Sequence, residues 1–308
     1  MSPLRRRLEE YLSVRRALGF KLEREGRVLP DFLTYLEERG TDVITTTMAM
    51  DWAMERSGAS RDRASRRLSP VRIFARHIKA IDPRTEVPPS SLWPCRVHRG
   101  TPFLYSEEDI VRLVEAAGTL RPPLRAATYT TLLGLLAITG MRVGEALRLD
   151  RQDVDDHQGL LVIRHSKFDK SREVPVHVTT ARKLRAYACV RDKLCPQRKA
   201  PAFFLSTVGT RPIYNNILRT FHLLLRNTGQ PHLSGTCRPR IHDLRHTFAV
   251  RTLLHWYRAG LDVEALLPRL STYLGHVCPA STYWYLSAAP ELLALAAERL
   301  PPAQRERP

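Results

Sequence analysis

The chain has 308 residues, enough for one large domain or two of ordinary size. Its hydrophobic content of 43% supports a buried core, and 49 basic against 31 acidic residues give a formal net charge of +18. Such an excess favours polyanionic partners. No apolar run approaches the ~20 residues that a membrane span needs, and no apolar stretch follows the charged start of the chain. We therefore expect neither a membrane anchor nor a secretory signal.

Arginine and cysteine usage refine this picture. Seven of the 49 basic residues are lysine, which leaves 42 arginines. Arginine suits bidentate contacts with phosphate, although a GC-rich genome would produce the same bias. The five cysteines are odd in number and form no CxxC pair. They argue for a reducing compartment, and hence a cytoplasmic protein, and against a disulfide framework or a zinc knuckle.

Four amphipathic helices are predicted between residues 4 and 80. The first has one broad apolar stripe that ends before Gly19, made of Leu4, Leu8, Tyr11, Leu12 and Val14. The next two are expected within residues 28–40 and 45–58, and the fourth within 60–81, where Pro70 should kink or split the helix.

The fourth helix carries a surplus of arginine. Asp62 is its one acidic residue, so pairing four residues apart cannot neutralise the basic side chains. A solvated helix face is the ordinary alternative, but we expect contact with a nucleic-acid backbone. The candidate contact residues are Arg61, Arg63, Arg66, Arg67, Arg72 and Arg76.

A segment rich in proline separates this part from the rest. Residues 82–103 hold five prolines and show no periodicity, which is typical of a linker. We expect a helical domain over residues 1–84, a linker over 85–103 and a larger domain over 104–308.

The larger domain combines helices with a single hairpin. Helices are predicted from Ser106, over an apolar stretch closed by Gly140, within 181–194 and 215–229, and over 242–259 and 291–300. Residues 159–178 read as a β-hairpin, with a polar turn followed by alternating valines. The predicted fold class is mainly α with a small antiparallel β-sheet.

Two segments of this domain offer a lone cation. Gly140 can adopt a positive φ and end its helix, which places Arg142 at a turn where Glu145 could orient it. Lys167 lies at the end of the first hairpin strand, and lysine, unlike arginine, can give up a proton to act as a general acid. Taken alone, each of the two residues fits a surface position better than a catalytic one.

The segment "IHDLRH" poses a choice between a metal and an anion. His242 and His246 are four residues apart, the spacing of a divalent metal site on a helix. Arg245 shares the face of His242, however, and a guanidinium is a poor neighbour for a cation. Both side chains can reach one anion at the positive end of a helix. A structural role for the pair stays open.

The segment "LGHVCPASTYWYL" contains His276 and, nine residues later, Tyr285. A phenol is a poor nucleophile unless neighbouring positive charge stabilises its anion. Two arginines, a lysine and two histidines around one phosphate would supply that charge. Aromatic core packing is the alternative for this segment alone.

Together the segments resemble the tyrosine recombinases, the phage-integrase and Xer-type site-specific recombinases. The order Arg, Lys, His-x-x-Arg, His, Tyr is that of the family, as are "TGMRVGEALRL", "HDLRHTFA" and "LGH". The resemblance spans roughly residues 104–298, and "SRRLSPVRIFARHI" looks like the last helix of the family's core-binding domain.

The resemblance implies a role for each residue. Arg142 and Arg245 would clamp the scissile phosphate of double-stranded DNA, and Lys167 would protonate the leaving 5′-oxygen. His242 and His276 would assist proton movement and hold the phosphate. Tyr285 would form a 3′-phosphotyrosyl link, which a partner strand then attacks, with no cofactor, metal or ATP.

Two departures from the family pattern affect this carry-over. The step from Arg245 to His276 is 31 residues, longer than in many relatives, and Tyr283 lies beside Tyr285. The spacing from His276 favours Tyr285. The apolar segment after it implies docking on a neighbouring subunit, and hence a homotetramer, or a mixed tetramer with a related recombinase, on paired sites. The alternatives are an inactive DNA-binding relative and an enzyme that relaxes DNA in the manner of type IB topoisomerases.

Overall fold

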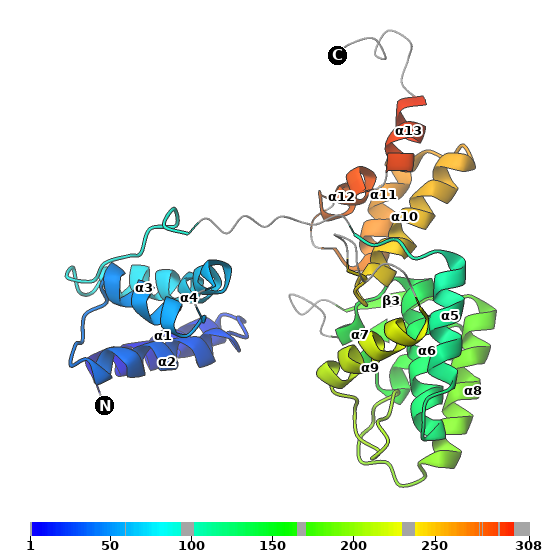
Figure 1. Ribbon diagram of the computed structural model, residues 1–308, viewed down its shortest axis with the longest axis horizontal. Coiled ribbons are helices and arrows are strands. Elements are labelled where there is room, and N and C mark those ends of the chain that lie inside the picture. The colour runs from blue at the N-terminus through cyan, green and yellow to red at the C-terminus, as the bar shows by residue number, and fades with distance from the viewer. Residues whose placement is uncertain are drawn as a thin grey trace. The chain divides into compact units, whose positions relative to one another are not determined.

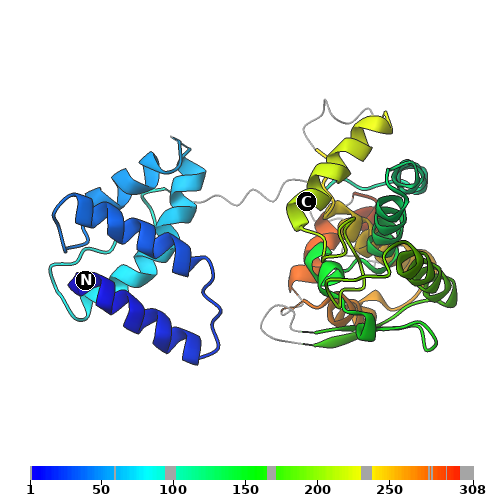
Figure 2. The same ribbon diagram turned by 90° about the horizontal axis from the view of Figure 1, so that it is seen from below.

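The computed structural model describes residues 2–58, 60–93, 102–164, 171–229, 238–276, 278, 280–288 and 290–298. The chain divides into an N-terminal unit, residues 1–99, and a C-terminal unit, residues 100–308 (Figures 1 and 2). None of the helices in the described residues combines the length and the hydropathy needed to cross a membrane.

Four helices form the N-terminal unit. They are α1 (Pro3–Ala17), α2 (Glu25–Glu38), α3 (Thr46–Glu55) and α4 (Arg61–Lys79). The first four residues of the predicted stripe of α1 are buried and join a core that includes Phe32, Trp52 and Phe74. Val14, also expected on this stripe, is 61% exposed because it lies outside that core. The side chain of Thr45 accepts from the backbone N–H of Met48 at 3.2 Å and caps α3.

Pro70 was expected to kink or split α4, and the structure excludes the split. The helix runs unbroken through this position, and Pro70 is buried within it. Its neighbours Leu68, Val71 and Phe74 are fully buried in the core of the unit. Packing of this apolar stripe offsets the hydrogen bond that a proline inside a helix removes.

The first part of the proline-rich segment lies against the N-terminal unit. Val87 and Trp93 pack on its core, and the hydroxyl of Ser65 donates to the carbonyl of Trp93 at 2.8 Å. Glu86 accepts from the backbone N–H of Thr46 at 2.8 Å. Residues 85–93 of the expected linker are therefore anchored by side-chain and backbone contacts.

The C-terminal unit is mostly helical. Its helices are α5 (Glu107–Gly118), α6 (Pro123–Thr139), α7 (Val143–Arg148), the 3-10 helix η1 (Arg151–Asp153), α8 (Val178–Leu194), α9 (Tyr214–Asn227), α10 (Asp243–Arg258), α11 (Val263–Leu274), α12 (Ala280–Ala288) and α13 (Pro290–Glu298). The apolar helix α6 packs against α5, α8 and α10, as its all-round hydrophobic sequence requires (Figure 1). A second core joins α10 to α11, α12 and α13.

A small antiparallel sheet completes the unit. Its strands are β1 (Val154–Asp155), β2 (Leu160–Ile163) and β3 (Arg172–Pro175), in the order β1-β2-β3. In the predicted hairpin Leu161 pairs with Val174 and Ile163 with Arg172. The sequence did not predict β1, which has only two residues. The predicted fold class, mainly α with a small antiparallel sheet, is confirmed.

Candidate active site

Arg142 lies where the sequence predicted, in the turn between α6 and α7. Gly140 ends α6 with a φ of 59°, and a side chain there would meet the ring of Phe248 at 2.5 Å. Only glycine fits this turn. Arg142 precedes α7, and its guanidinium donates to Glu145 at 2.7 Å and to the carbonyl of Gly275 at 3.1 Å.

Glu145 is the buried carboxylate of the site. It also accepts from the backbone N–H of Arg142 at 3.0 Å and takes two bonds from Arg172, at 3.1 and 2.9 Å. Burial would raise the pKa of this carboxyl, but the bonds and charge of Arg172 and Arg142 lower it to about 2. Glu145 is thus ionised at neutral pH and fixes two guanidinium groups.

Arg245 is the most deeply buried cation of the site, with 2% of the residue exposed. It lies in the first turn of α10, and its guanidinium donates to the carbonyls of Gly140 and Leu274, both at 2.9 Å. Arg142 donates to the next carbonyl along the chain, that of Gly275. Besides burial, the charge of Arg142 contributes to lowering the pKa of Arg245, so the two guanidinium groups are close enough to repel each other.

The two histidines of the "HDLRH" segment meet at the start of α10. The rings of His242 and His246 lie edge to face, with 4.9 Å between centroids. Burial, together with the charges of His246, Arg245 and Arg142, lowers the pKa of His242 to about 4, although part of the residue stays open to solvent. Its imidazole is therefore neutral at neutral pH. The ring of His246 lies against Trp284 and Tyr285.

His276 follows the glycine that ends α11. Its Nδ1 is 2.7 Å from the hydroxyl of Thr282, which is itself buried, and this leaves Nε2 as the remaining polar atom of the ring. Burial and the charges of Arg245, Arg142 and Arg172 lower the pKa of His276 to about 4. This imidazole is also neutral at neutral pH.

Tyr285 of α12 lies among these groups. Its ring stacks on His276 at 6.0 Å and tilts against His246 at 5.5 Å between centroids. Burial lowers the pKa of Arg245 to about 10, and the charge and hydrogen bond of Tyr285 act in the opposite direction. Tyr285 is 2% exposed, whereas Tyr283 is 48% exposed. The neighbouring tyrosine thus lies on the surface while Tyr285 contacts the cations.

The site has the electrostatics of an anion-binding pocket. Two guanidinium groups, those of Arg142 and Arg172, bond one carboxylate, Glu145, whose charge also acts on the guanidinium of Arg245. Like charges held this close to one another out of water are stabilised by a bound anion. Within the described part of the chain, no group of three or more His, Cys, Asp or Glu side chains is arranged to hold a metal ion.

Five of the six predicted catalytic residues converge in this site: Arg142, His242, Arg245, His276 and Tyr285. The sixth, Lys167, lies outside the described residues. Sequence reasoning missed Arg172, although a signal for it existed. Residues two apart on a strand share a face, so Arg172 shares the face of Val174, which is 1% exposed.

The six arginines of α4 have different environments. Arg61, Arg63, Arg66 and Arg76 are exposed, and Arg66 forms an ion pair with Asp62 at 2.8 Å. Arg67 bonds Asp31 at 2.9 Å.

Arg72 differs from the others because it is only 9% exposed. Its guanidinium donates to the carbonyls of Pro88 and Pro89 at 3.0 and 3.1 Å, so it fastens the proline-rich segment. That position does not fit the expectation that Arg72 contacts a nucleic-acid backbone.

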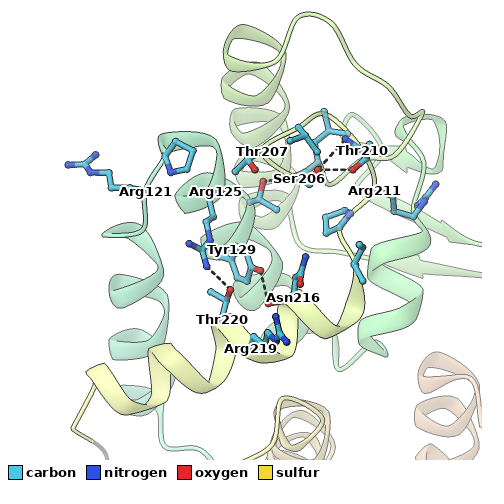
Figure 3. A pocket seen from close by; sticks show the side chains of 16 residues that line it. Arg121, Arg125, Tyr129, Ser206, Thr207, Thr210, Arg211, Asn216, Arg219 and Thr220 are labelled. Atoms are coloured by element: carbon cyan, nitrogen blue, oxygen red, sulfur yellow. Dashed lines mark hydrogen bonds between the residues drawn. The ribbon is translucent and has the colours of Figure 1, made fainter.

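A second basic region lies at the other end of α6 (Figure 3). A pocket of about 520 Å³ is bounded by the start of α6, residues 205–213 and α9, and its lining includes Arg121, Arg125 and Arg219. Arg125 faces α9 and donates to Thr220 at 2.8 Å. The 17 residues of α6 separate this pocket from Arg142 by about 25 Å along the helix, at ~1.5 Å per residue.

Comparisons with known proteins agree with this geometry. The model of the phage integrase family matches residues 104–291. The protein y4rB of Sinorhizobium fredii, which carries the name integrase/recombinase, is 46% identical over 97% of this chain and 98% of its own length. Tyrosine recombinase XerC of Chlamydia muridarum is 30% identical over 74% of this chain and 67% of its own length.

Solved structures share the fold at lower sequence identity. The XerA recombinase has a TM-score of 0.52 with 23% identity and covers 99% of both chains. The Tn1549 transposon integrase in complex with transposon right-end DNA has a TM-score of 0.65 with 16% identity, over 95% of this chain and 98% of that one. A λ integrase tetramer bound to a Holliday junction has a TM-score of 0.59 with 18% identity, over 92% of this chain and 76% of that one.

Proposed function

Because this chain belongs to the phage integrase family and is a tyrosine-type site-specific DNA recombinase, we propose that Tyr285 is its nucleophile. The observation that carries this proposal is the convergence of Arg142 and Arg245 on adjacent backbone carbonyls beside that phenol. Developing phenolate and phosphorane charge would be stabilised by groups already in place, which is the most effective form of electrostatic catalysis.

The first chemical step exchanges one phosphodiester for another. The Tyr285 oxygen attacks the phosphorus, a P–O bond forms to the phenol, and the bond to the 5′-oxygen of the DNA breaks. In this proposal the imidazoles of His242 and His276, which are neutral at neutral pH, accept the phenolic proton or donate a bond to a non-bridging oxygen. Lys167 gives a proton to the leaving 5′-oxygen.

The second step reverses the first on a new strand. The 5′-hydroxyl of a partner strand attacks the 3′-phosphotyrosyl bond, and Tyr285 leaves and regains its proton. The energy of the broken bond is kept in the protein–DNA link, so the exchange needs no ATP, and the guanidinium groups supply the positive charge that a metal would otherwise contribute.

DNA is held by two basic surfaces in this proposal. The exposed arginines of α4 are Arg61, Arg63, Arg66 and Arg76, and the second surface is formed by Arg121, Arg125 and Arg219 of the pocket between α6 and α9. Guanidinium groups pair with phosphate oxygens in a bidentate manner. The N-terminal unit would then be the core-binding domain and the C-terminal unit the catalytic domain. Free Cys189, Cys195 and Cys278 fit a reducing, cytoplasmic setting.

We further propose that four copies assemble on a pair of sites. The fold shared with a λ integrase tetramer on a Holliday junction supports this proposal, because strand exchange between two duplexes requires four cleavages. Mass photometry with paired duplex sites would show a mass of four chains and two duplexes. A homogeneous population of one chain on each duplex, while exchange still occurs, would contradict it.

A nicked suicide substrate tests the chemistry. Cleavage beside the nick releases a short fragment, so the strand cannot rejoin and the covalent complex accumulates. We expect the wild-type chain to form a complex that survives denaturing electrophoresis. Relaxation of supercoiled plasmid without exchange between two sites would instead support the topoisomerase-like alternative, and binding with no covalent complex would support an inactive DNA-binding relative.

A further inference from the structure

Arg172 begins strand β3 and contacts three parts of the active site. Its side chain is 11% exposed, and two of its nitrogens donate to the two oxygens of Glu145. The third, Nε, donates to the carbonyl of Tyr273 at 2.9 Å. Each of the three guanidinium nitrogens therefore donates to a group of the protein.

Through Glu145, Arg172 acts on Arg142. The same carboxylate oxygen, Oε1, accepts from Arg142 at 2.7 Å and from Arg172 at 3.1 Å. A planar fork that binds both oxygens of a carboxylate fixes the plane of that carboxylate. Because Glu145 is held in one plane, the guanidinium of Arg142 is held in one direction.

Arg172 also acts on the clamp, by which we mean the guanidinium groups of Arg142 and Arg245, through the turn that ends α11. Gly275 has a φ of 71°, and a Cβ there would lie 2.5 Å from the Nη1 atom of Arg172. The guanidinium thus packs directly on the glycine turn. The carbonyls of Leu274 and Gly275 in that turn accept from Arg245 and Arg142, and His276 follows immediately.

We propose that Arg172 is a positioning residue that holds the Glu145 carboxylate and the Gly275 turn in the arrangement that aligns Arg142 and Arg245 on a phosphate. It rests on the proposed function, since the clamp has a role only if this site binds the scissile phosphate. Arg172 acts on the clamp and not on the protonation of the leaving group.

Two variants test this role, Arg172→Lys and Arg172→Met. Lysine keeps the charge but can bond Glu145 through only one nitrogen, whereas methionine removes both charge and bonds. We expect Arg172→Met to slow single-turnover cleavage of the suicide substrate by about 100-fold, in the range seen when one preorganised donor is lost. Arg172→Lys should be intermediate, and both should bind duplex DNA within about threefold of wild type.

Arg164 provides the matched control. It lies at the end of β2 beside the same hairpin and forms an ion pair with Asp153 at 2.6 Å, with half of its side chain exposed. Arg164→Met removes an ion-paired arginine directly after strand β2, and the ion pair that it removes is with Asp153 and not with Glu145. Its cleavage rate should stay within about threefold of wild type.

Two altered phosphates separate positioning from general loss of structure. A neutral methylphosphonate at the scissile position lacks the charge that the clamp neutralises, so the deficit of Arg172→Met should shrink at least tenfold on it. A 5′-bridging sulfur needs no proton to leave, so it should rescue Lys167→Ala but not Arg172→Met. If the melting temperature shows that Arg172→Met is unfolded under the assay conditions, the cleavage rates of Arg172→Lys, which keeps the charge, decide the test.

The outcomes separate the two levels of the proposal. If the wild-type chain forms no covalent complex, the proposed function fails. If the wild type does form it and Arg172→Lys and Arg172→Met cleave at the wild-type rate, only the role of Arg172 is overturned. An equal deficit on the charged and the methylphosphonate substrates, or rescue by the bridging sulfur, overturns it as well.

Discussion

Arginine serves two different purposes in the two units of this chain. Most arginine side chains of α4 are exposed, among them those of Arg61, Arg63 and Arg76. In the active site Arg245 is 2% exposed, and both of its terminal nitrogens bond backbone carbonyls at 2.9 Å. The N-terminal unit exposes its arginine charge to solvent, and the C-terminal unit holds the charge of Arg245 with hydrogen bonds to the backbone.

Burial, more than charge, decides what an arginine contributes. An exposed guanidinium in water acts on a polyanion at long range and with little directional preference, and salt screens it. A buried guanidinium loses its hydration and is worth its cost only when its bonds are satisfied and its direction is fixed. Substitutions in the active site should therefore alter reaction rates, and those on α4 should alter affinity.

The largest effect is expected at the nucleophile. Tyr285→Phe removes the attacking oxygen and nothing else, so the covalent complex on the suicide substrate should disappear while duplex binding is kept. Tyr283→Phe is the matched control, because that tyrosine is 48% exposed, and it should trap DNA as wild type does. A covalent complex that persists in Tyr285→Phe and disappears in Tyr283→Phe would identify Tyr283 as the nucleophile instead.

A loss of about 100- to 1,000-fold in cleavage rate is expected for Arg245→Lys, the range for removal of a preorganised donor. Lysine keeps the charge but cannot bond Gly140, Leu274 and a phosphate in one plane. Single-turnover kinetics and a binding titration on the same duplex give the two quantities. If Arg245→Lys lost DNA affinity and cleavage rate by the same factor, the idea that active-site arginines control rate and α4 arginines control affinity would be contradicted.

Gly275→Ala should reduce both stability and cleavage. The added methyl would meet Arg172 at 2.5 Å in a turn with a φ of 71°, at a cost of about 1–3 kcal/mol in the free energy of unfolding. Gly260→Ala is the control, since Gly260 has the same φ of 71° and open space around it. Urea denaturation of both variants isolates the free-energy cost of the clash with Arg172. Equal losses of unfolding free energy in the two variants would show that contact with Arg172 does not contribute.

Smaller effects are expected on α4. Replacing Arg61, Arg63 and Arg76 together by glutamine should weaken binding of duplex DNA and reduce the slope of log affinity against log salt by about one per lost phosphate contact. The rate of cleavage at saturating protein should not change. An unaltered salt slope would mean that this face does not contact DNA.

The smallest effect concerns pH. The pKa of His276 is lowered to about 4 in the folded chain, against about 6.5 when unfolded. Below pH 6.5 the unfolded chain binds the proton and the folded one does not, so stability falls as pH drops from 6.5 to 4 and levels off below. In His276→Asn the decrease in melting temperature between pH 7 and pH 5 should be smaller, and an identical decrease would contradict the assignment.

The separated motifs predicted much of the site because each carries its own local signal. Gly140 ends a helix and Ser106 begins one, as predicted, and the structure shows a capping box at Ser106. Arg172 was missed because its role depends on a bond to Glu145, 27 residues away, and on the turn at Gly275. Such pairing arises from tertiary packing and leaves only the two-residue period of a strand in the sequence.

Sequence-based prediction of the fold also failed at a proline, at a short strand and at one buried arginine. Pro70 was expected to kink or split α4, but burial of the stripe around it keeps the helix unbroken. Strand β1 has two residues, too few for any periodicity, and exists because Val154 and Asp155 pair with β2. In sequence Arg72 looks like its exposed neighbours on α4. In the structure the proline-rich segment lies against α4, and Arg72 donates to the carbonyls of Pro88 and Pro89.

The central claim is that cations from distant segments meet around one phenol and make it attack DNA. Its most direct test is mass spectrometry of peptides from the covalent complex trapped on the nicked duplex. The account predicts a nucleotide-bearing peptide whose modified residue is Tyr285. Modification of Tyr283, of a serine or of any other side chain would contradict it.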